Sequence, residues 1–146
     1  MIEEGCSADI IANHINKNLK ANIALGGVDS EKTNIKFNHI EQSKQEGIFV
    51  VEGGDTLLIE SNIIMGNQDG IVMLHSNGVV ISNKIQDNET DGISLVSNTF
   101  ARIEGNLIEN NKLHGIEIKD PSHPVLINNK IQGNTYQVGL DKKIRN

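Results

Sequence analysis

The feature that most constrains this chain is a short formula that recurs six times. Each copy begins with Asn and has an aliphatic residue two positions later, and three positions after that comes a second Asn, which Ser43 replaces in the second copy. The copy then leads to Gly and two alternating aliphatic residues, and the clearest copy runs from Asn106 to Ile118. The first and last copies are weaker, with Asn22 and Gln137 where the others have Gly. The first Asn stands at positions 13, 38, 62, 83, 106 and 129, so the spacings are 25, 24, 21, 23 and 23 residues. A period of this length predicts one stacked supersecondary unit per copy.

The apolar residues inside each unit indicate strands. One lies three positions before the first Asn, one lies two positions after it, and two follow the Gly with a period of two. Most are Ile or Val, which favour strands, and no window has helical spacing. We therefore predict three short strands per unit, with the next unit stacked about 4.8 Å away. The expected fold is an all-β, right-handed parallel β-helix (solenoid) of about six coils, right-handed by the crossover preference.

The repeats account for nearly the whole chain and define one domain. Residues 1–7 are expected to form an N-terminal lead-in, residues 8–140 a single β-helix domain, and residues 141–146 a charged C-terminal tail. Aromatic residues make up only 3% of the chain and Trp is absent. Such a composition suits a narrow solenoid filled by stacked aliphatic side chains.

Stacking also predicts columns of Asn and Gly. The first Asn of each unit should form a ladder of bonded amides, which stabilises in-register strands. A second ladder is expected from the second Asn, interrupted at Ser43, and Asn also tolerates the left-handed backbone of a sharp turn. The Gly column should need positive φ or close packing; Asn22 is a plausible substitute there, and Gln137 is a poor one that should distort the last coil. The structural ladder is Asn13, Asn38, Asn62, Asn83, Asn106 and Asn129, the second ladder is Asn18, Asn67, Asn88, Asn111 and Asn134, and the Gly column is Gly47, Gly70, Gly92 and Gly115.

The formula resembles the parallel β-helix repeat family of the pectate-lyase-like superfamily, and the resemblance covers roughly residues 8–141. Two turns, Asp120-Pro121-Ser122-His123-Pro124 and Glu52-Gly53-Gly54-Asp55-Thr56, are most similar to those of eukaryotic F-box-associated β-helix proteins. The family also contains carbohydrate enzymes and periplasmic copper-maturation proteins. The resemblance implies the fold, and it carries no chemistry because the motif residues build the coil.

Charge and composition argue against several partners. The net charge is −6 and the basic residues are scattered, so no nucleic-acid footprint is expected. No apolar run has membrane-spanning length, and Met1-Ile2-Glu3-Glu4 lacks the features of a signal peptide, so a cytoplasmic location is expected. The single Cys6 excludes an internal disulfide, and no cofactor is expected.

Outward-facing columns offer two candidate sites. Phe49, Val51, Val72 and Leu74 should form an exposed apolar patch, which is typical of a partner site or of a surface covered by another segment. His14 and His39 on adjacent coils, with Glu41, could hold a metal ion, although a surface His pair more often binds none. Uncapped terminal coils would also permit self-association.

Two arrangements that suggest catalysis are interpreted as structural. His75, Ser97 and Asp120 share a column but open polar turns, with no oxyanion donor nearby, so no catalytic triad is assigned. Acidic residues also fail to gather in one column with Arg102, which counts against a carbohydrate enzyme. These acidic residues are Glu41, Glu60, Glu104, Glu109 and Glu117.

The preferred interpretation is therefore a non-catalytic protein-binding or scaffold module, such as a substrate-recognition or adaptor region of a larger protein. No catalytic residue is assigned, and the expected partner is a protein or a second copy of the chain. The alternative is a fragment of a carbohydrate-active enzyme, such as a polysaccharide lyase, hydrolase or epimerase.

Overall fold

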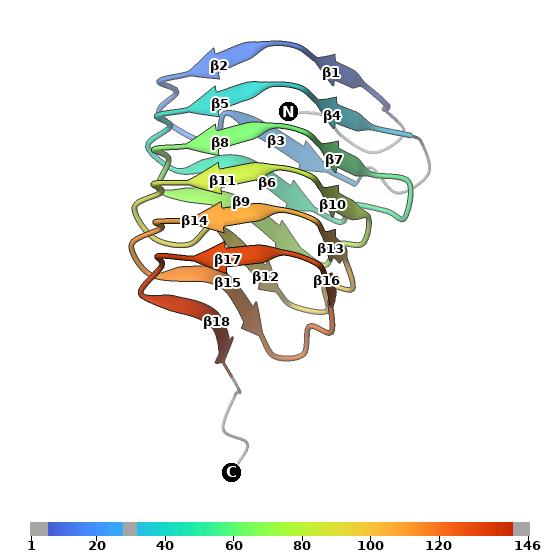
Figure 1. The fold of residues 1–146 in the computed structure, drawn as a ribbon. Coiled ribbons are helices and arrows are strands. Elements are labelled where there is room, and N and C mark those ends of the chain that lie inside the picture. Colours follow the sequence, from blue (N-terminus) through green and yellow to red (C-terminus); the bar gives the residue numbers. More distant parts are fainter. Residues whose placement is uncertain (1–5, 28–31, 142–146) are drawn as a thin grey trace.

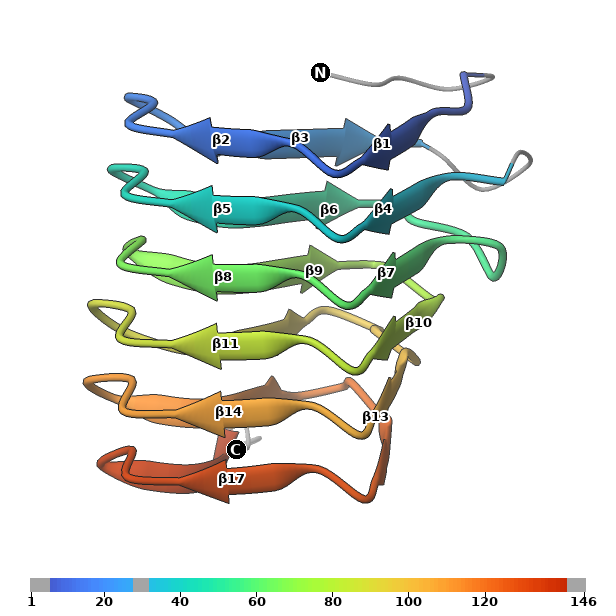
Figure 2. The same ribbon diagram turned by 45° about the horizontal axis from the view of Figure 1, so that its top comes forward.

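The computed structural model describes residues 6–27 and 32–141, and these residues form a parallel β-helix of six coils (Figure 1). Each coil contributes one strand to each of three parallel sheets, so neighbours within a sheet are three strands apart in the chain. Figure 2 shows the coils stacked in sequence order. The expected all-β fold is confirmed. Three parts of the chain lie outside the described residues: the first five residues of the lead-in, residues 28–31 of the β-helix domain, and residues 142–146 of the tail.

The strands are short and equivalent from coil to coil. The first sheet contains β1 (Asp9–Ile11), β4 (Asn34–Lys36), β7 (Leu58–Glu60), β10 (Val79–Ile81), β13 (Arg102–Glu104) and β16 (Val125–Ile127). The second sheet contains β2 (His14–Asn16), β5 (His39–Glu41), β8 (Ile63–Met65), β11 (Lys84–Gln86), β14 (Leu107–Glu109) and β17 (Lys130–Gln132). The third sheet contains β3 (Ile23–Gly26), β6 (Glu46–Val51), β9 (Asp69–Leu74), β12 (Ile93–Val96), β15 (His114–Lys119) and β18 (Tyr136–Asp141).

The core is a set of aliphatic columns inside the three sheets. Equivalent residues of successive coils pair in register, as Ile59 does with Val80 and Ile85 does with Ile108. All four side chains are fully buried. The apolar positions predicted from sequence are therefore the interior positions of the structure. Separately, no helix that could cross a membrane occurs among the described residues.

The corners between sheets depend on a left-handed residue placed directly before each ladder Asn. Ser61 and Ser82, which precede Asn62 and Asn83, have φ values of 55° and 57°. The ladder Asn residues themselves do not have positive φ, so the expectation that Asn supplies the left-handed backbone is wrong. The left-handed residue turns the chain, and the following Asn satisfies the backbone groups exposed at the corner.

The first Asn ladder is continuous through all six coils. Asn62 shows the pattern: its Oδ1 accepts from both the backbone N–H and the Nδ2 of Asn38, each at 3.0 Å. Its Nδ2 donates to Asn83 Oδ1 and to the carbonyl of Ile35, each at 2.9 Å. Each amide thus replaces sheet hydrogen bonds that the corner interrupts, and the predicted ladder is confirmed.

The Gly column is required for close packing between coils. None of its four members has positive φ. A Cβ on Gly92 would lie 2.6 Å from the carbonyl oxygen of Gly115, 2.7 Å from a methyl group of Ile108 and 2.8 Å from Asn111 Nδ2. These four positions therefore require Gly because of close packing between coils, and not because of positive φ.

The second ladder is not interrupted at Ser43, because the side chain of Asn22 takes the place of the missing amide. Asn22 stands at the Gly position of the first coil, and its Nδ2 donates to Asn67 Oδ1 at 3.2 Å and to the carbonyl of Glu41 at 3.0 Å. Asn18 in turn donates to Asn22 Oδ1 at 2.7 Å. The side chain that the Gly column normally excludes is accommodated here because Ser43 is small.

This exchange predicts a strong coupling between positions 22 and 43. Asn22→Gly should remove three side-chain hydrogen bonds and cost about 1–2 kcal/mol of unfolding free energy. Ser43→Asn should force two amides into one space and cost about 1–3 kcal/mol. The double variant recreates the Asn–Gly pair of the inner coils, so it should lie within about 1 kcal/mol of the wild type. Urea unfolding of all four proteins measures the cycle, and additive losses would contradict it.

The last coil keeps the regular register despite Gln137. Strand β18 pairs with β15 from His114 opposite Tyr136 to Lys119 opposite Asp141, so the expected distortion is wrong. Gln137 bonds to the last Asn of the second ladder, which lies in the same coil. Its Oε1 accepts from Asn134 Nδ2 at 3.1 Å, and its Nε2 donates to the Asn134 carbonyl at 3.0 Å. Val138 and Leu140 continue interior columns but are 43% and 67% exposed in the described structure.

Candidate acid–base site

The outer face of the third sheet changes from apolar to polar along the helix axis. In coils two and three its outward columns pair Phe49 with Val72 and Val51 with Leu74. From coil four onward the first column continues with Ser94 opposite Glu117. A further column, directly before the Gly position, begins with Ala21 and carries polar side chains in coils two to six, where it reads Glu46, Asp69, Asp91, His114 and Tyr136.

Four side chains from these columns form what we call the acid–base cluster: Asp91, His114, Glu117 and Lys119. Donor atoms of the first three lie within 4.8 Å of one another. Asp91 Oδ1 accepts the backbone N–H of His114 at 3.0 Å and lies 2.9 Å from His114 Nδ1. Glu117 accepts a hydrogen bond from Ser94 Oγ at 3.2 Å and pairs with Lys119 Nζ at 3.0 Å. The Asp91 side chain is only 8% exposed, so its hydrogen bonds with His114 largely replace contact with water.

The two carboxyl groups of the cluster have pKa values displaced in opposite directions. Burial raises the pKa of Asp91, and its hydrogen bond with Glu117 raises it further. Burial alone would raise the pKa of Glu117, but hydrogen bonds with Lys119 and Asp91 outweigh burial and lower it. Within the pair, Asp91 is therefore the weaker acid and Glu117 the stronger acid.

The same contacts determine how the His114 ring is presented. Asp91 Oδ1 is the acceptor for the backbone N–H, so we assign a proton to Nδ1 of the neutral ring, where it donates to the same oxygen. The lone pair is then on Nε2. Neighbouring groups whose pKa values are pushed apart, together with an oriented imidazole, are the ordinary components of general acid–base catalysis.

A cavity of about 320 Å³ adjoins this cluster at the C-terminal end of the third sheet. The ring of Tyr136 lies 5.3 Å from that of His114, and this side chain is 56% exposed. Gly139 leaves room for the imidazole, because a Cβ there would lie 2.5 Å from His114 Cδ2 and 2.7 Å from Nε2. The lining residues are His114, Glu117, Tyr136, Val138, Gly139, Leu140 and Asp141.

Gly139→Ala should displace the His114 ring while leaving the coil folded. The added methyl group meets a side chain rather than backbone, so rotation of the ring relieves the clash and weakens the bond to Asp91. We expect the ¹⁵N shifts of the His114 ring to lose the signature of the Nδ1–H tautomer. Gly105→Ala is the control: its φ of 61° adds a left-handed penalty of about 1–2 kcal/mol, but its methyl group would meet only Ser82 Oγ, at 3.9 Å, and not His114. An unchanged His114 spectrum in Gly139→Ala would contradict this geometry.

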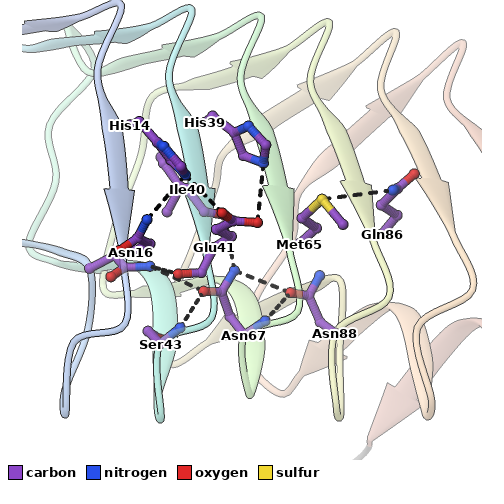
Figure 3. A network of polar contacts seen from close by, with 11 residues as sticks. His14, Asn16, His39, Ile40, Glu41, Ser43, Met65, Asn67, Gln86 and Asn88 are labelled. Carbon is purple, nitrogen blue, oxygen red and sulfur yellow. Dashed lines mark hydrogen bonds and ion pairs between the residues drawn. The ribbon is translucent and has the colours of Figure 1, made fainter.

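The structure also brings together the metal candidate predicted from sequence. His14 pairs with His39 in register, and both rings approach Glu41 on the second sheet (Figure 3). His14 Nε2 lies 2.7 Å from Glu41 Oε1, and this hydrogen bond lowers the pKa of Glu41. The predicted proximity of the three side chains is therefore present.

Two other predictions concern the outer surface. The four residues of the apolar patch, Phe49, Val51, Val72 and Leu74, do lie on one outward face, and each is half-buried. His75 and Ser97 have φ values of 48° and 49°, which agrees with their interpretation as turn residues. Arg102 pairs with Glu104 at 2.7 Å on the first sheet, away from the acid–base cluster.

Sequence reasoning missed Asp91, His114 and Lys119 as members of a site. From sequence, Glu117 is named only among the acidic residues that do not gather in one column with Arg102. The missed signal is the polar column directly before the Gly positions, in which Asp91 and His114 stand one coil apart and His114 is three residues from Glu117.

The comparisons with known proteins agree with the fold. A family model described as right handed beta helix region matches residues 1–142. Among curated proteins, none matches the chain at a significant level. A crystal structure of a double mutant of the periplasmic alginate epimerase AlgG is similar with a TM-score of 0.68 and 21% identity, over 89% of this chain and 34% of that chain. This chain therefore spans about a third of that protein, and the likeness shows the fold, including its right-handed coil.

Proposed function

Because the chain belongs to the right-handed β-helix family, whose coils can present side chains in rows on a rigid outer face, we propose that its third sheet carries an acid–base site for a uronate-containing polysaccharide. The observation that carries the proposal is the acid–base cluster beside the cavity. A buried carboxyl with raised pKa, an ionised carboxylate and an oriented imidazole meet there.

Each member of the cluster has a role in this proposal. Nε2 of His114 accepts the proton next to the sugar carboxylate, and Asp91 positions the ring through its contact with Nδ1. Lys119 supplies a positive charge for the substrate carboxylate. Burial alone would lower the pKa of Lys119, but its hydrogen bond with Glu117 outweighs burial and raises that pKa. Tyr136 offers an exposed ring against which a sugar face can pack.

The choice of substrate class has separate support. Removing a proton next to a carboxylate requires a base and a group that stabilises the developing charge, and the cluster contains both. The similar crystal structure is named as an alginate epimerase, and alginate is a polymer of uronates. These considerations favour the carbohydrate-active enzyme over the non-catalytic module that the sequence alone favours. Removal of the proton next to the carboxylate leads either to epimerisation or to elimination.

The test is proton exchange on polyuronates. Alginate and polygalacturonate are incubated with the protein in D₂O, and deuterium uptake next to the carboxylate is followed by NMR, with dextran as a neutral control. Epimerisation should give deuterium uptake with a polyuronate, because a solvent proton replaces the one removed, whereas elimination should give the signals of a new carbon–carbon double bond without net uptake. The rate of either reaction should fall at least about 100-fold in His114→Gln. His123→Gln, an exposed histidine outside the cluster, is the matched control. Absence of both binding and exchange with every polyuronate would contradict the proposal.

A second candidate function is supported by the half-buried patch Phe49, Val51, Val72 and Leu74. An apolar outward row next to polar columns also suits a protein partner, as in a scaffold or adaptor module. The similarity of two turns to those of F-box-associated β-helix proteins supports this second candidate. The partner could also be a second copy of the chain, bound through the exposed side chains of Val138 and Leu140. Polar substitution of Phe49 and Val72 would weaken partner binding under this second candidate and leave proton exchange unchanged under the first.

A further inference from the structure

A second cluster, on the outer face of the second sheet and independent of the acid–base cluster, has the composition of a metal site. We propose that His14, His39 and Glu41 bind one divalent transition-metal ion of the zinc class. The two histidines come from adjacent strands β2 and β5, and Glu41 lies two residues beyond His39, so all three side chains are on one face.

The donor atoms already converge on a common point. His14 Nε2 lies 2.7 Å from Glu41 Oε1, and His39 Nε2 lies 3.4 Å from Glu41 Oε2. The ring centroids of the two histidines are 4.9 Å apart, and the three donor atoms lie within 4.8 Å of one another. In a tetrahedral zinc site, bonds of about 2.0–2.2 Å place neighbouring ligand atoms roughly 3.3–3.5 Å apart. Side-chain shifts of less than about 1 Å therefore suffice to admit an ion.

The second observation concerns the polar atoms that the protein leaves unsatisfied. His39 Nε2 is buried and has no hydrogen bond, although it faces the carboxylate of Glu41. Glu41 is bonded to His14 on its other oxygen, and Asn16 Nδ2 lies 3.2 Å from the same His14 nitrogen. The His39 side chain is 43% exposed, but Nε2 itself is buried, and its contact with Glu41 Oε2, at 3.4 Å, is too long for a good hydrogen bond. A poorly satisfied buried nitrogen costs free energy, and coordination would remove that cost. This arrangement distinguishes the cluster from an ordinary pair of surface histidines.

The ligand types select the ion. Two imidazole nitrogens and one carboxylate suit zinc and its neighbours among the divalent transition metals, whereas calcium and magnesium prefer sites made of oxygen alone. His14 is more than half exposed, which leaves the fourth position open to water. The ligands come from coils one and two, so a bound ion would fasten the first coil, whose β1 and β2 are more exposed than the strands of the inner coils.

The experiment is titration of the whole chain with zinc chloride by calorimetry, after removal of metals with a chelator. We expect one ion per chain, a higher melting temperature with zinc, and no displacement by excess calcium or magnesium. His39→Gln and Glu41→Gln should weaken zinc binding at least about tenfold, while their melting temperatures without metal stay close to that of the wild type. Cobalt(II) in place of zinc should give the visible absorption of a tetrahedral complex.

The acid–base cluster is the necessary control, because Asp91, His114 and Glu117 also offer three potential ligands. His114→Gln should leave zinc affinity unchanged if the ion binds at His14, His39 and Glu41. Loss of binding in His114→Gln with retention in His39→Gln would overturn the proposal. Equal affinity in the wild type and His39→Gln, or an octahedral cobalt spectrum, would overturn it as well and indicate opportunistic surface binding. None of these outcomes depends on polysaccharide activity.

Discussion

Asn62→Ala is expected to lower the free energy of unfolding by about 3–6 kcal/mol, because it leaves several buried backbone groups without partners. The Asn62 side chain bonds to the backbone N–H of Asn38, the carbonyl of Ile35 and the amide groups of both neighbouring ladder residues. The position is 1% exposed, so water cannot replace these bonds without entering the interior. The loss should far exceed that of a typical single hydrogen bond.

Urea unfolding followed by circular dichroism measures this loss, and Asn13→Ala is the control within the same column. Asn13 lies in the first coil, is exposed, and donates to Asn38 without accepting from a preceding ladder amide among the described residues. Its replacement should cost only about 1 kcal/mol. Equal losses at the two positions would show that the ladder does not satisfy buried backbone groups in the way described.

Gly92→Ala is expected to destabilise the protein by about 2–4 kcal/mol through overpacking. The added Cβ would lie 2.6 Å from a backbone oxygen, 2.7 Å from the core residue Ile108 and 2.8 Å from the ladder residue Asn111. None of these atoms belongs to a flexible surface chain, so relief requires separation of coils four and five. The loss should appear both in the urea midpoint and in faster amide exchange on β12 and β15.

Gly66→Ala separates overpacking from backbone strain. Gly66 has φ of 63°, but a Cβ there would meet only Gln42 Cγ, at 3.8 Å. Its replacement should therefore cost only the left-handed penalty of about 1–2 kcal/mol, without faster exchange across neighbouring coils. If Gly92→Ala is no more costly than Gly66→Ala, the close-packing explanation of the Gly column is wrong.

The fold could be predicted from sequence because every coil repeats the same physical requirements. An interior column accepts any aliphatic side chain of similar size, as at Ile59, Val80 and Ile103. Asn repeated at a fixed spacing has few structural roles other than an amide ladder. The corner geometry was harder to predict. The left-handed residue before each Asn varies between Ser, Gly, Phe and others, so its position has no consistent sequence signal.

The candidate sites depend on relations between coils that a single repeat does not reveal. Asn22 looks like a weak Gly substitute until Ser43, one coil away, is seen to make room for it. The acid–base cluster likewise depends on which columns adjoin: Asp91 precedes a Gly, and Glu117 follows one in the next coil. The pKa displacements arise from burial and mutual hydrogen bonds, which only the stacked structure provides.

The most direct measurement of the central claim is an NMR titration of the side-chain carboxyl ¹³C signals of Asp91 and Glu117 in the folded chain. The cluster predicts that Asp91 titrates above the ordinary pKa of aspartate, because burial and its hydrogen bond with Glu117 raise its pKa. Glu117 should titrate below the ordinary pKa of glutamate, because its hydrogen bonds with Lys119 and Asp91 outweigh burial. The cluster also predicts that Lys119→Met raises the pKa of Glu117. Ordinary and independent titration of both groups, unchanged by Lys119→Met, would contradict an acid–base site on this face.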